Sequence, residues 1–149
     1  LREADMALAD LRHCALAGAD LTRARGLEET LEGARLGSER GRPVSLIEVR
    51  FRGAHCDGAD FSGARLVNAH LQEAELRDAR FYGSRLQAAH LEQAKLAGAR
   101  FQRANISDAY FHGAEFDLPA LRSITRSFGW RKAHFDPDVR ATLERLSGE

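Results

Sequence analysis

The amino-acid sequence predicts an all-β solenoid, in which the chain winds into stacked coils around a narrow apolar core. Three observations support this prediction. Apolar residues recur at every fifth position, a small residue lies two positions before each of them, and glycine recurs two positions after them. A period of five fits neither an α-helix, which repeats about every 3.6 residues, nor a straight strand, which alternates. The chain must therefore turn once in each repeat and point one large and one small residue inward.

The large inward positions run without interruption from Phe51 to Phe116, and all fourteen are apolar. Two positions before each of them, twelve of the fourteen residues are alanine. The N-terminal stretch continues the pattern with the large positions Leu1, Met6, Leu11, Leu16 and Leu21. This regularity predicts a ladder of large and small side chains along the core.

The glycines predict where the chain turns. Seven of them lie two residues after a large position: Gly18, Gly53, Gly58, Gly63, Gly83, Gly98 and Gly113. Glycine, asparagine and aspartate tolerate the positive φ that many turns require. All three prolines lie outside the regular repeats, as expected if each coil needs its N–H groups to pair with the next. A corner is therefore predicted directly after each large residue.

Three stretches carry a family resemblance: Ala19-Asp20-Leu21, Ala59-Asp60-Phe61 and Ala104-Asn105-Ile106. They resemble the A-(D/N)-L-x-x consensus of pentapeptide-repeat proteins, and the resemblance covers residues 1–25 and 46–116. It implies a right-handed quadrilateral β-helix with four repeats per coil and coils stacked at about 4.8 Å. The position before the large residue is usually Asp or Asn in that family. Here it is often Arg, His, Lys or Glu, which predicts a different surface.

The pattern divides the chain into four parts. Residues 1–25 form a first repeat segment of about one coil, which we expect to be truncated upstream because the chain starts inside a repeat. Residues 26–45 form a break with a short helix and a loop, within which residues 34–36 look like one isolated repeat. Residues 46–116 form the second repeat segment, and residues 117–149 a C-terminal helical cap.

Two helices are predicted in that cap. The first is capped by Asp117, continues through Phe128 and is closed by Gly129. The second starts at Asp136-Pro137. A solenoid end exposes core and unpaired backbone groups, so these helices are expected to cover it. The alternative is a dimerisation element, so the chain is expected to be a monomer or a dimer through a solenoid end.

The composition argues against several classes of function. There are 22 Lys and Arg against 22 Asp and Glu, so no net charge draws the chain to nucleic acid or to an anionic membrane. No apolar run is long enough to span a membrane, and no signal peptide is evident. Cys14 and Cys56 occupy repeat positions otherwise held by Ala or Leu, which favours reduced thiols acting as small hydrophobic residues over metal or redox chemistry. A cytoplasmic location and no cofactor are expected.

With four repeats per coil, residues twenty apart lie above one another. This places His70 above His90, in line with Arg50 and Tyr110. A metal site in this column would need acidic or Cys ligands beside the histidines, and these are not evident. Glu75, Lys95 and Glu115 form a second column of alternating charge, which we interpret as structural.

Two further columns bring like charges together: Arg80 with Arg100, and Arg65 with Arg85. Either these guanidinium groups are solvated and neutralised by nearby carboxylates such as Asp60 and Asp78, or they form a basic strip for an acidic partner. The candidate partner surface comprises six residues: Arg65, Arg80, Arg85, Arg100, Arg40 and Arg42.

The predicted function is a non-catalytic scaffold that presents a rigid surface to an unidentified protein partner. No phosphate-binding loop, nucleophile motif or carboxylate pair in a predictable pocket is present in the sequence, so an enzyme is not expected. The alternative comes from the family. Some pentapeptide-repeat proteins mimic DNA and bind type II topoisomerases such as gyrase, which protects against quinolones. That role goes with long acidic rods, and this chain is neutral and short.

Overall fold

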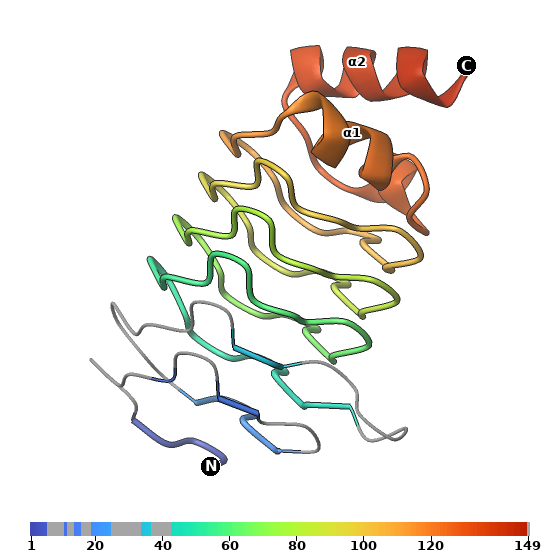
Figure 1. Cartoon of the computed structure of the whole chain (residues 1–149). Coiled ribbons are helices and arrows are strands. Elements are labelled where there is room, and N and C mark those ends of the chain that lie inside the picture. Colours follow the sequence, from blue (N-terminus) through green and yellow to red (C-terminus); the bar gives the residue numbers. More distant parts are fainter. Residues whose placement is uncertain (6–10, 12–13, 16–18, 25–33, 37–42, 149) are drawn as a thin grey trace.

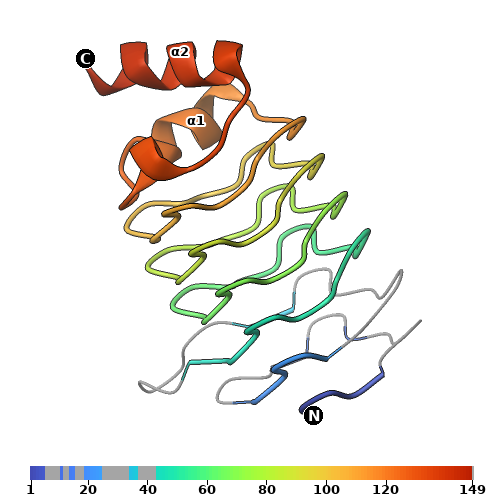
Figure 2. The same ribbon diagram turned by 180° about the vertical axis from the view of Figure 1, so that it is seen from behind.

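The structure is a computed structural model that describes residues 1–5, 11, 14–15, 19–24, 34–36 and 43–148. Coils are stacked into a rod, two helices cover one end of it, and the two chain termini lie at opposite ends (Figures 1 and 2). Each coil contributes one bridging residue to each of four columns, and the columns advance by twenty residues per coil from residue 45 to residue 115. The four-sided stack that the family resemblance implied is therefore present.

Backbone hydrogen bonds join each coil to the next in a parallel ladder. The Phe81 N–H donates to the Arg100 carbonyl at 2.8 Å, and the Arg80 N–H donates to the Ala59 carbonyl at 2.9 Å. The same pattern repeats along the four columns, and where the last coil ends the Phe101 N–H donates to Ser123 Oγ at 3.0 Å instead. It satisfies the main-chain groups on both sides of each coil.

The corners lie where the glycines predicted them. From Glu48 to Gly113, the residue two positions after each large core residue has a positive φ, whether it is glycine or not. Each corner is closed by a hydrogen bond from the small core residue to the preceding large one, as from Ser84 N to the Phe81 carbonyl at 3.0 Å. The turn imposes a positive φ even on residues that have a side chain, since Ala88 adopts φ 54 and Gln93 adopts φ 60.

The core is a ladder of stacked side chains. Phe81 is fully buried, and its ring lies parallel to Phe61 at 5.0 Å and to Phe101 at 4.9 Å. This confirms the predicted column of phenylalanines. Cys56 is buried in the same core, as its repeat position predicted, and Cys14 is half-buried.

The stack is continuous across part of the predicted break. Arg35 pairs with Ala15 on one side and with Asp60 on the other, and Ala34 and Leu36 are buried in the core. The step from residue 35 to residue 60 is twenty-five residues, one repeat longer than the regular step. Residues 34–36 therefore belong to the stack, although the sequence pattern made them look isolated. The predicted short helix over residues 26–33 lies outside the described residues.

The C-terminal end is helical, as predicted. Helix α1 spans Leu118–Ile124, the 3-10 helix η1 spans Trp130–Lys132, and α2 spans Pro137–Ser147. Asp117 caps α1 by accepting a hydrogen bond from Ala120 N. Ile124, Trp130, Phe135 and Leu143 bury their side chains, and Phe135 stacks on Phe111 of the last coil at 4.9 Å. Within the described part of the chain, no helix is long and apolar enough to cross a membrane.

One predicted boundary is wrong. The first helix ends at Ile124, and Phe128 does not lie on its apolar face. Instead, Phe128 N donates to the Ala104 carbonyl at 2.7 Å, and Ile106 N donates to the Phe128 carbonyl at 2.9 Å. The last coil leaves backbone groups unpaired, and pairing them with this segment is worth more than another helical turn.

Candidate interaction surface

The outward position before each large core residue carries most of the surface chemistry. On two adjoining sides of the rod it brings arginines together. Arg80 and Arg100 bridge in one column, and Arg65 and Arg85 bridge in the next, as their spacing predicted. Arg103 lies at the corner between these two sides and has no counterpart in the sequence-based prediction. We call these residues the arginine surface: Arg65, Arg80, Arg85, Arg100 and Arg103.

The arginine surface is exposed and poorly neutralised. Arg65, Arg80, Arg85 and Arg100 are all exposed, and none of them forms an ion pair with another described residue. Asp60 was expected to help neutralise them, but its carboxylate accepts a hydrogen bond from Ser62 N at 2.9 Å. The predicted positions Arg40 and Arg42 lie outside the described residues.

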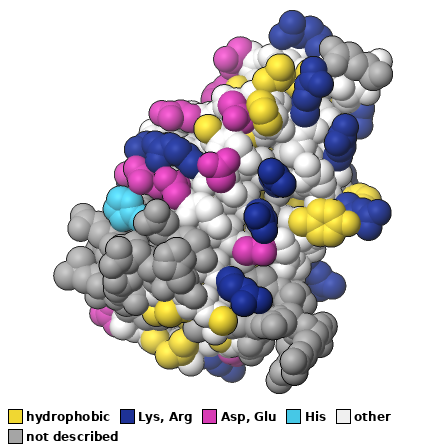
Figure 3. Space-filling model, viewed as in Figure 1, with side chains coloured by type: hydrophobic (Ala, Val, Ile, Leu, Met, Phe, Trp, Pro, Cys, Tyr) yellow, Lys and Arg dark blue, Asp and Glu magenta, His cyan; other side chains and the backbone are white. Residues whose placement is uncertain are grey.

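A hollow of about 460 Å³ opens on this surface. It is lined by Ser62, Arg80, Tyr82, Arg100 and Gln102. Tyr82 is 49% exposed, as expected for an outward corner residue, and the Arg103 guanidinium lies over its ring at 5.7 Å. Figure 3 shows that Lys and Arg side chains gather along one edge of the rod, with an exposed apolar side chain beside them, and that most acidic side chains in this view lie toward the other edge.

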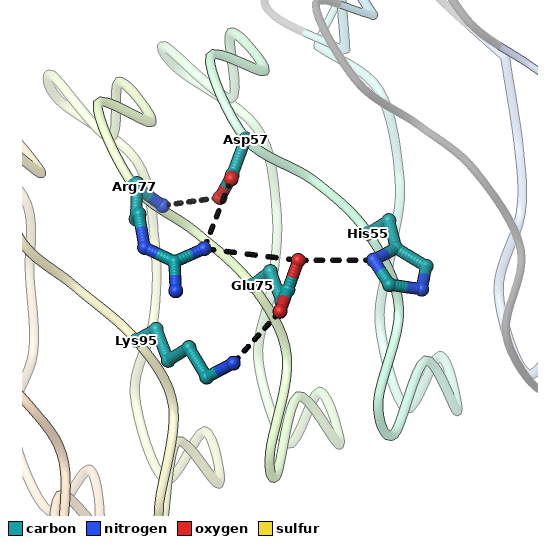
Figure 4. A network of polar contacts seen from close by, with 5 residues as sticks. All are labelled: His55, Asp57, Glu75, Arg77 and Lys95. Atoms are coloured by element: carbon teal, nitrogen blue, oxygen red, sulfur yellow. Dashed lines mark hydrogen bonds and ion pairs between the residues drawn. The ribbon is translucent and has the colours of Figure 1, made fainter.

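The remaining two sides hold paired charges. Glu75 accepts a hydrogen bond from Lys95 Nζ at 2.8 Å and contacts His55 Nδ1 at 3.0 Å. Arg77 pairs with Asp57 at 3.1 Å and lies 3.7 Å from Glu75 (Figure 4). Lys95 and His55 lower the pKa of Glu75 to about 2. The alternating column predicted from the sequence is therefore part of a wider ion-pair network.

A column of aromatic rings runs along one of these sides. His70 stacks on His90 at 5.0 Å, His90 on Tyr110 at 4.8 Å, and Tyr110 on His134 at 4.6 Å. The sequence predicted the first three members but missed His134, which lies in the cap and outside the repeat. Partial burial, together with His90 and Arg50, lowers the pKa of His70. Among the described residues, no group of three His, Cys, Asp or Glu side chains could hold a metal ion.

A larger hollow, of about 570 Å³, lies beside that ring column. It is lined by Glu3, Arg23, Glu48, Arg50, Asn68, His70 and His90. Its charges largely cancel, because Arg23 donates to Glu48 at 2.8 Å and lies 3.9 Å from Glu3. The smaller hollow on the arginine surface is therefore the stronger candidate for binding a charged partner.

The parallel four-column ladder and the period of five define this chain as a repeat solenoid. The family model for pentapeptide repeats matches residues 1–25, 45–83 and 84–118 with eight copies of the repeat. The chain belongs to the pentapeptide-repeat family.

Solved structures of the same family are similar to this one. HetL, a pentapeptide-repeat protein involved in regulating heterocyst differentiation in the cyanobacterium Nostoc sp. strain PCC 7120, is 29% identical with a TM-score of 0.70. The match covers 78% of this chain and 50% of HetL, so the chain spans half the length of that relative. QnrB1, a plasmid-mediated fluoroquinolone resistance protein, is 14% identical with a TM-score of 0.46 over 98% of this chain and 96% of its own. No curated protein matches the chain in sequence.

Proposed function

We propose that this chain is a non-catalytic scaffold whose arginine surface binds a partner protein. The observation that carries the proposal is the repetition of unpaired arginine in two adjoining columns. Like charges that face each other across neighbouring strands destabilise a sheet. The fold does not require them, because the same outward position holds His, Glu, Lys or Asn in other repeats. A partner with carboxylates would remove the repulsion and gain charge-assisted hydrogen bonds.

The architecture supports a binding role over a catalytic one. From Leu46 to Phe111, the large and small positions of the regular stack are buried and filled by Leu, Phe, Ile, Cys, Val and Ala, with one Ser. The chemically reactive side chains therefore lie on the outer sides of a rigid rod, which suits recognition by a surface. A basic surface also weighs against the DNA-mimic alternative, since a site that binds phosphates selects an anionic mimic.

The proposal is tested by affinity capture from native cell lysate with the wild-type chain and with an Arg80→Glu, Arg85→Glu double variant. The wild-type chain is expected to retain proteins that the double variant loses, and added salt should release them. The matched control is Arg50→Glu with Lys132→Glu, which makes the same change in net charge away from the arginine surface. Retention of the same proteins by all three chains, or loss from the control as well, would refute the proposal.

A further inference from the structure

The backbone pairing of Phe128 keeps its side chain exposed. It is 63% exposed, although phenylalanine is usually buried. Its N–H and carbonyl are both paired with the last coil, and it bridges to Asn105. This pairing places its side chain in the outward position at the end of the column that contains Arg65 and Arg85. The ring cannot turn into the core unless these two hydrogen bonds break.

The two exposed aromatic side chains lie on the same part of the rod. The large hydrophobic residues that are exposed among the described residues are Leu1, Tyr82, Leu118 and Phe128. Tyr82 lies at the corner between the two arginine columns, and Phe128 at the end of one of them. Tyrosine and arginine are enriched among the residues that carry most binding energy at protein interfaces, and aromatic residues are enriched in interface cores. Two aromatic anchors, Tyr82 and Phe128, therefore lie beside the charged side chains of the arginine surface.

The charge on this surface indicates the chemistry of the occupant. Between residues 46 and 116 there are nine Lys and Arg and nine Asp and Glu. Five of these nine cations lie in the two arginine columns or at the corner between them, where Asp60 is the one acid of the nine. All five are arginine, whose planar fork binds carboxylates with two hydrogen bonds. An acidic ligand therefore meets a local positive charge on a chain that has no net charge.

An acidic protein segment fits better than nucleic acid. Affinity for nucleic acid grows with the number of phosphates that a protein neutralises, and the acidic side chains of the remaining two sides would repel a long polyanion. A base-stacking platform also needs open ring faces, whereas the Arg103 guanidinium covers one face of Tyr82. A peptide can instead place one apolar side chain in the 460 Å³ hollow beside Tyr82 and another against Phe128.

We propose that the arginine surface, Tyr82 and Phe128 together form a docking site for an acidic protein segment that carries apolar side chains among its carboxylates. This inference rests on the proposed scaffold function and specifies its partner. The carboxylates pair with the arginines, and the apolar side chains contact the two aromatic rings. Neither part alone accounts for the composition of this surface.

The test uses a fluorescent synthetic peptide in which aspartate alternates with leucine and phenylalanine, followed by fluorescence anisotropy. The whole chain is expected to bind it. Phe128→Ser and Tyr82→Ser should each weaken binding by about tenfold, the effect of losing one strong contact. Leu118→Ser is the matched control, since Leu118 is 50% exposed at the start of α1 and outside the site. A peptide with serine in place of the apolar residues should bind more weakly than the first peptide.

Three results would overturn the inference: no binding of the peptide, equal binding by the Phe128→Ser variant and the wild type, or tighter binding of single-stranded oligothymidylate or of phosphatidylserine vesicles. The scaffold function can fail separately. If lysate proteins depend on Arg80 and Arg85 but not on Tyr82 or Phe128, the scaffold proposal stands and this docking site does not. If they depend on neither pair, both proposals fail.

Discussion

The arginine surface and the side of the rod around Glu75, here called the paired side, have the same backbone but opposite charge arrangements. Glu75 lies between Lys95 and His55 of the neighbouring coils, and Asp57 pairs with Arg77 of the next coil. Around Arg80 and Arg85, the same spacing between coils brings cation onto cation. Identical columns therefore hold either complementary or repulsive charges, and neither arrangement changes the core beneath.

This difference teaches that the outward positions of the solenoid are weakly constrained by folding. An exposed ion pair contributes only about 0.2–1 kcal/mol, and a like-charge pair costs a similar amount. The buried ladder of Phe, Leu and Ala contributes far more. A surface can therefore be set by the needs of binding at a small cost in stability.

The largest expected effect comes from a core substitution, which should destabilise both sides equally because they share one core. Phe81→Ala should lower the free energy of unfolding by about 3–5 kcal/mol, since it removes a fully buried ring stacked between Phe61 and Phe101. Phe81→Asp should prevent folding. Thermal melts followed by circular dichroism measure both, and unchanged melting of Phe81→Asp would contradict the stacked core.

Two charge reversals, one on each side, test whether surface charge contributes to stability with opposite sign on the two sides. Lys95→Glu removes the partner of Glu75 and places three carboxylates in one column with Glu115, which should cost roughly 1 kcal/mol. Arg85→Glu, the matched change on the other side, converts repulsion from Arg65 into attraction and should raise stability by about 0.3 kcal/mol. Urea unfolding of the two variants distinguishes them. Equal losses would show that surface pairing is not what separates the two sides.

A corner substitution tests whether the shared backbone, independent of charge, carries strain. Ala88 adopts φ 54, a conformation that costs a residue with a Cβ about 1–2 kcal/mol. Ala88→Gly should therefore raise stability by roughly 0.5–1 kcal/mol, after allowing for the greater freedom of glycine in the unfolded chain.

Gly58→Ala, at another corner of the stack, provides the reverse control. It has φ 69 and open space around an added Cβ, so the conformational cost is isolated from any clash. Stability should fall by about 0.5–1 kcal/mol in urea unfolding, after the same allowance for the freedom of glycine in the unfolded chain. A gain for Gly58→Ala, or a loss for Ala88→Gly, would mean that the corners relax on substitution.

The smallest expected effect is the pH dependence of the ion pairs around Glu75. The pKa of Glu75 is lowered from 4.5 to about 2 in the folded chain. Its stabilising effect is therefore complete above pH 4.5 and is lost as pH falls toward 2. Glu75→Gln should be less stable than the wild type at neutral pH and should show a flatter loss across this range. Because Glu75 is partly exposed, high salt should shrink the difference. Parallel acid melts of the two chains would disprove the assignment.

The sequence predicted the repeating part of this fold in detail, because one period determines several features at once. The positive φ at each corner follows from the spacing of five. The phenylalanine column and the stacking of Arg80 on Arg100 follow from that spacing together with the four repeats per coil that the family resemblance implied. Which side chains become neutralised did not follow. Asp60 lies in the column of Arg80 but bonds a backbone amide, a local choice that periodicity does not encode.

The cap was harder to predict, because it completes the columns without repeating the motif. Phe128 and His134 take bridging positions above Asn105 and Tyr110 after steps of twenty-three and twenty-four residues. Helical spacing of apolar residues favoured burying Phe128 on the first helix. The open edge of the last coil took precedence, and this is why the aromatic anchor of the docking site could not be found from the sequence.

The advance of twenty residues per coil makes the rod a ruler with fixed divisions. Duplicating or deleting twenty residues between two corners would keep every column in register and change the length by one sheet spacing, about 4.8 Å. An insertion or deletion that is not a multiple of twenty residues interrupts this spacing, and the step from Arg35 to Asp60 is twenty-five residues. The reach of the arginine columns can therefore evolve one coil at a time, while Phe128 and His134 fix where the ruler ends.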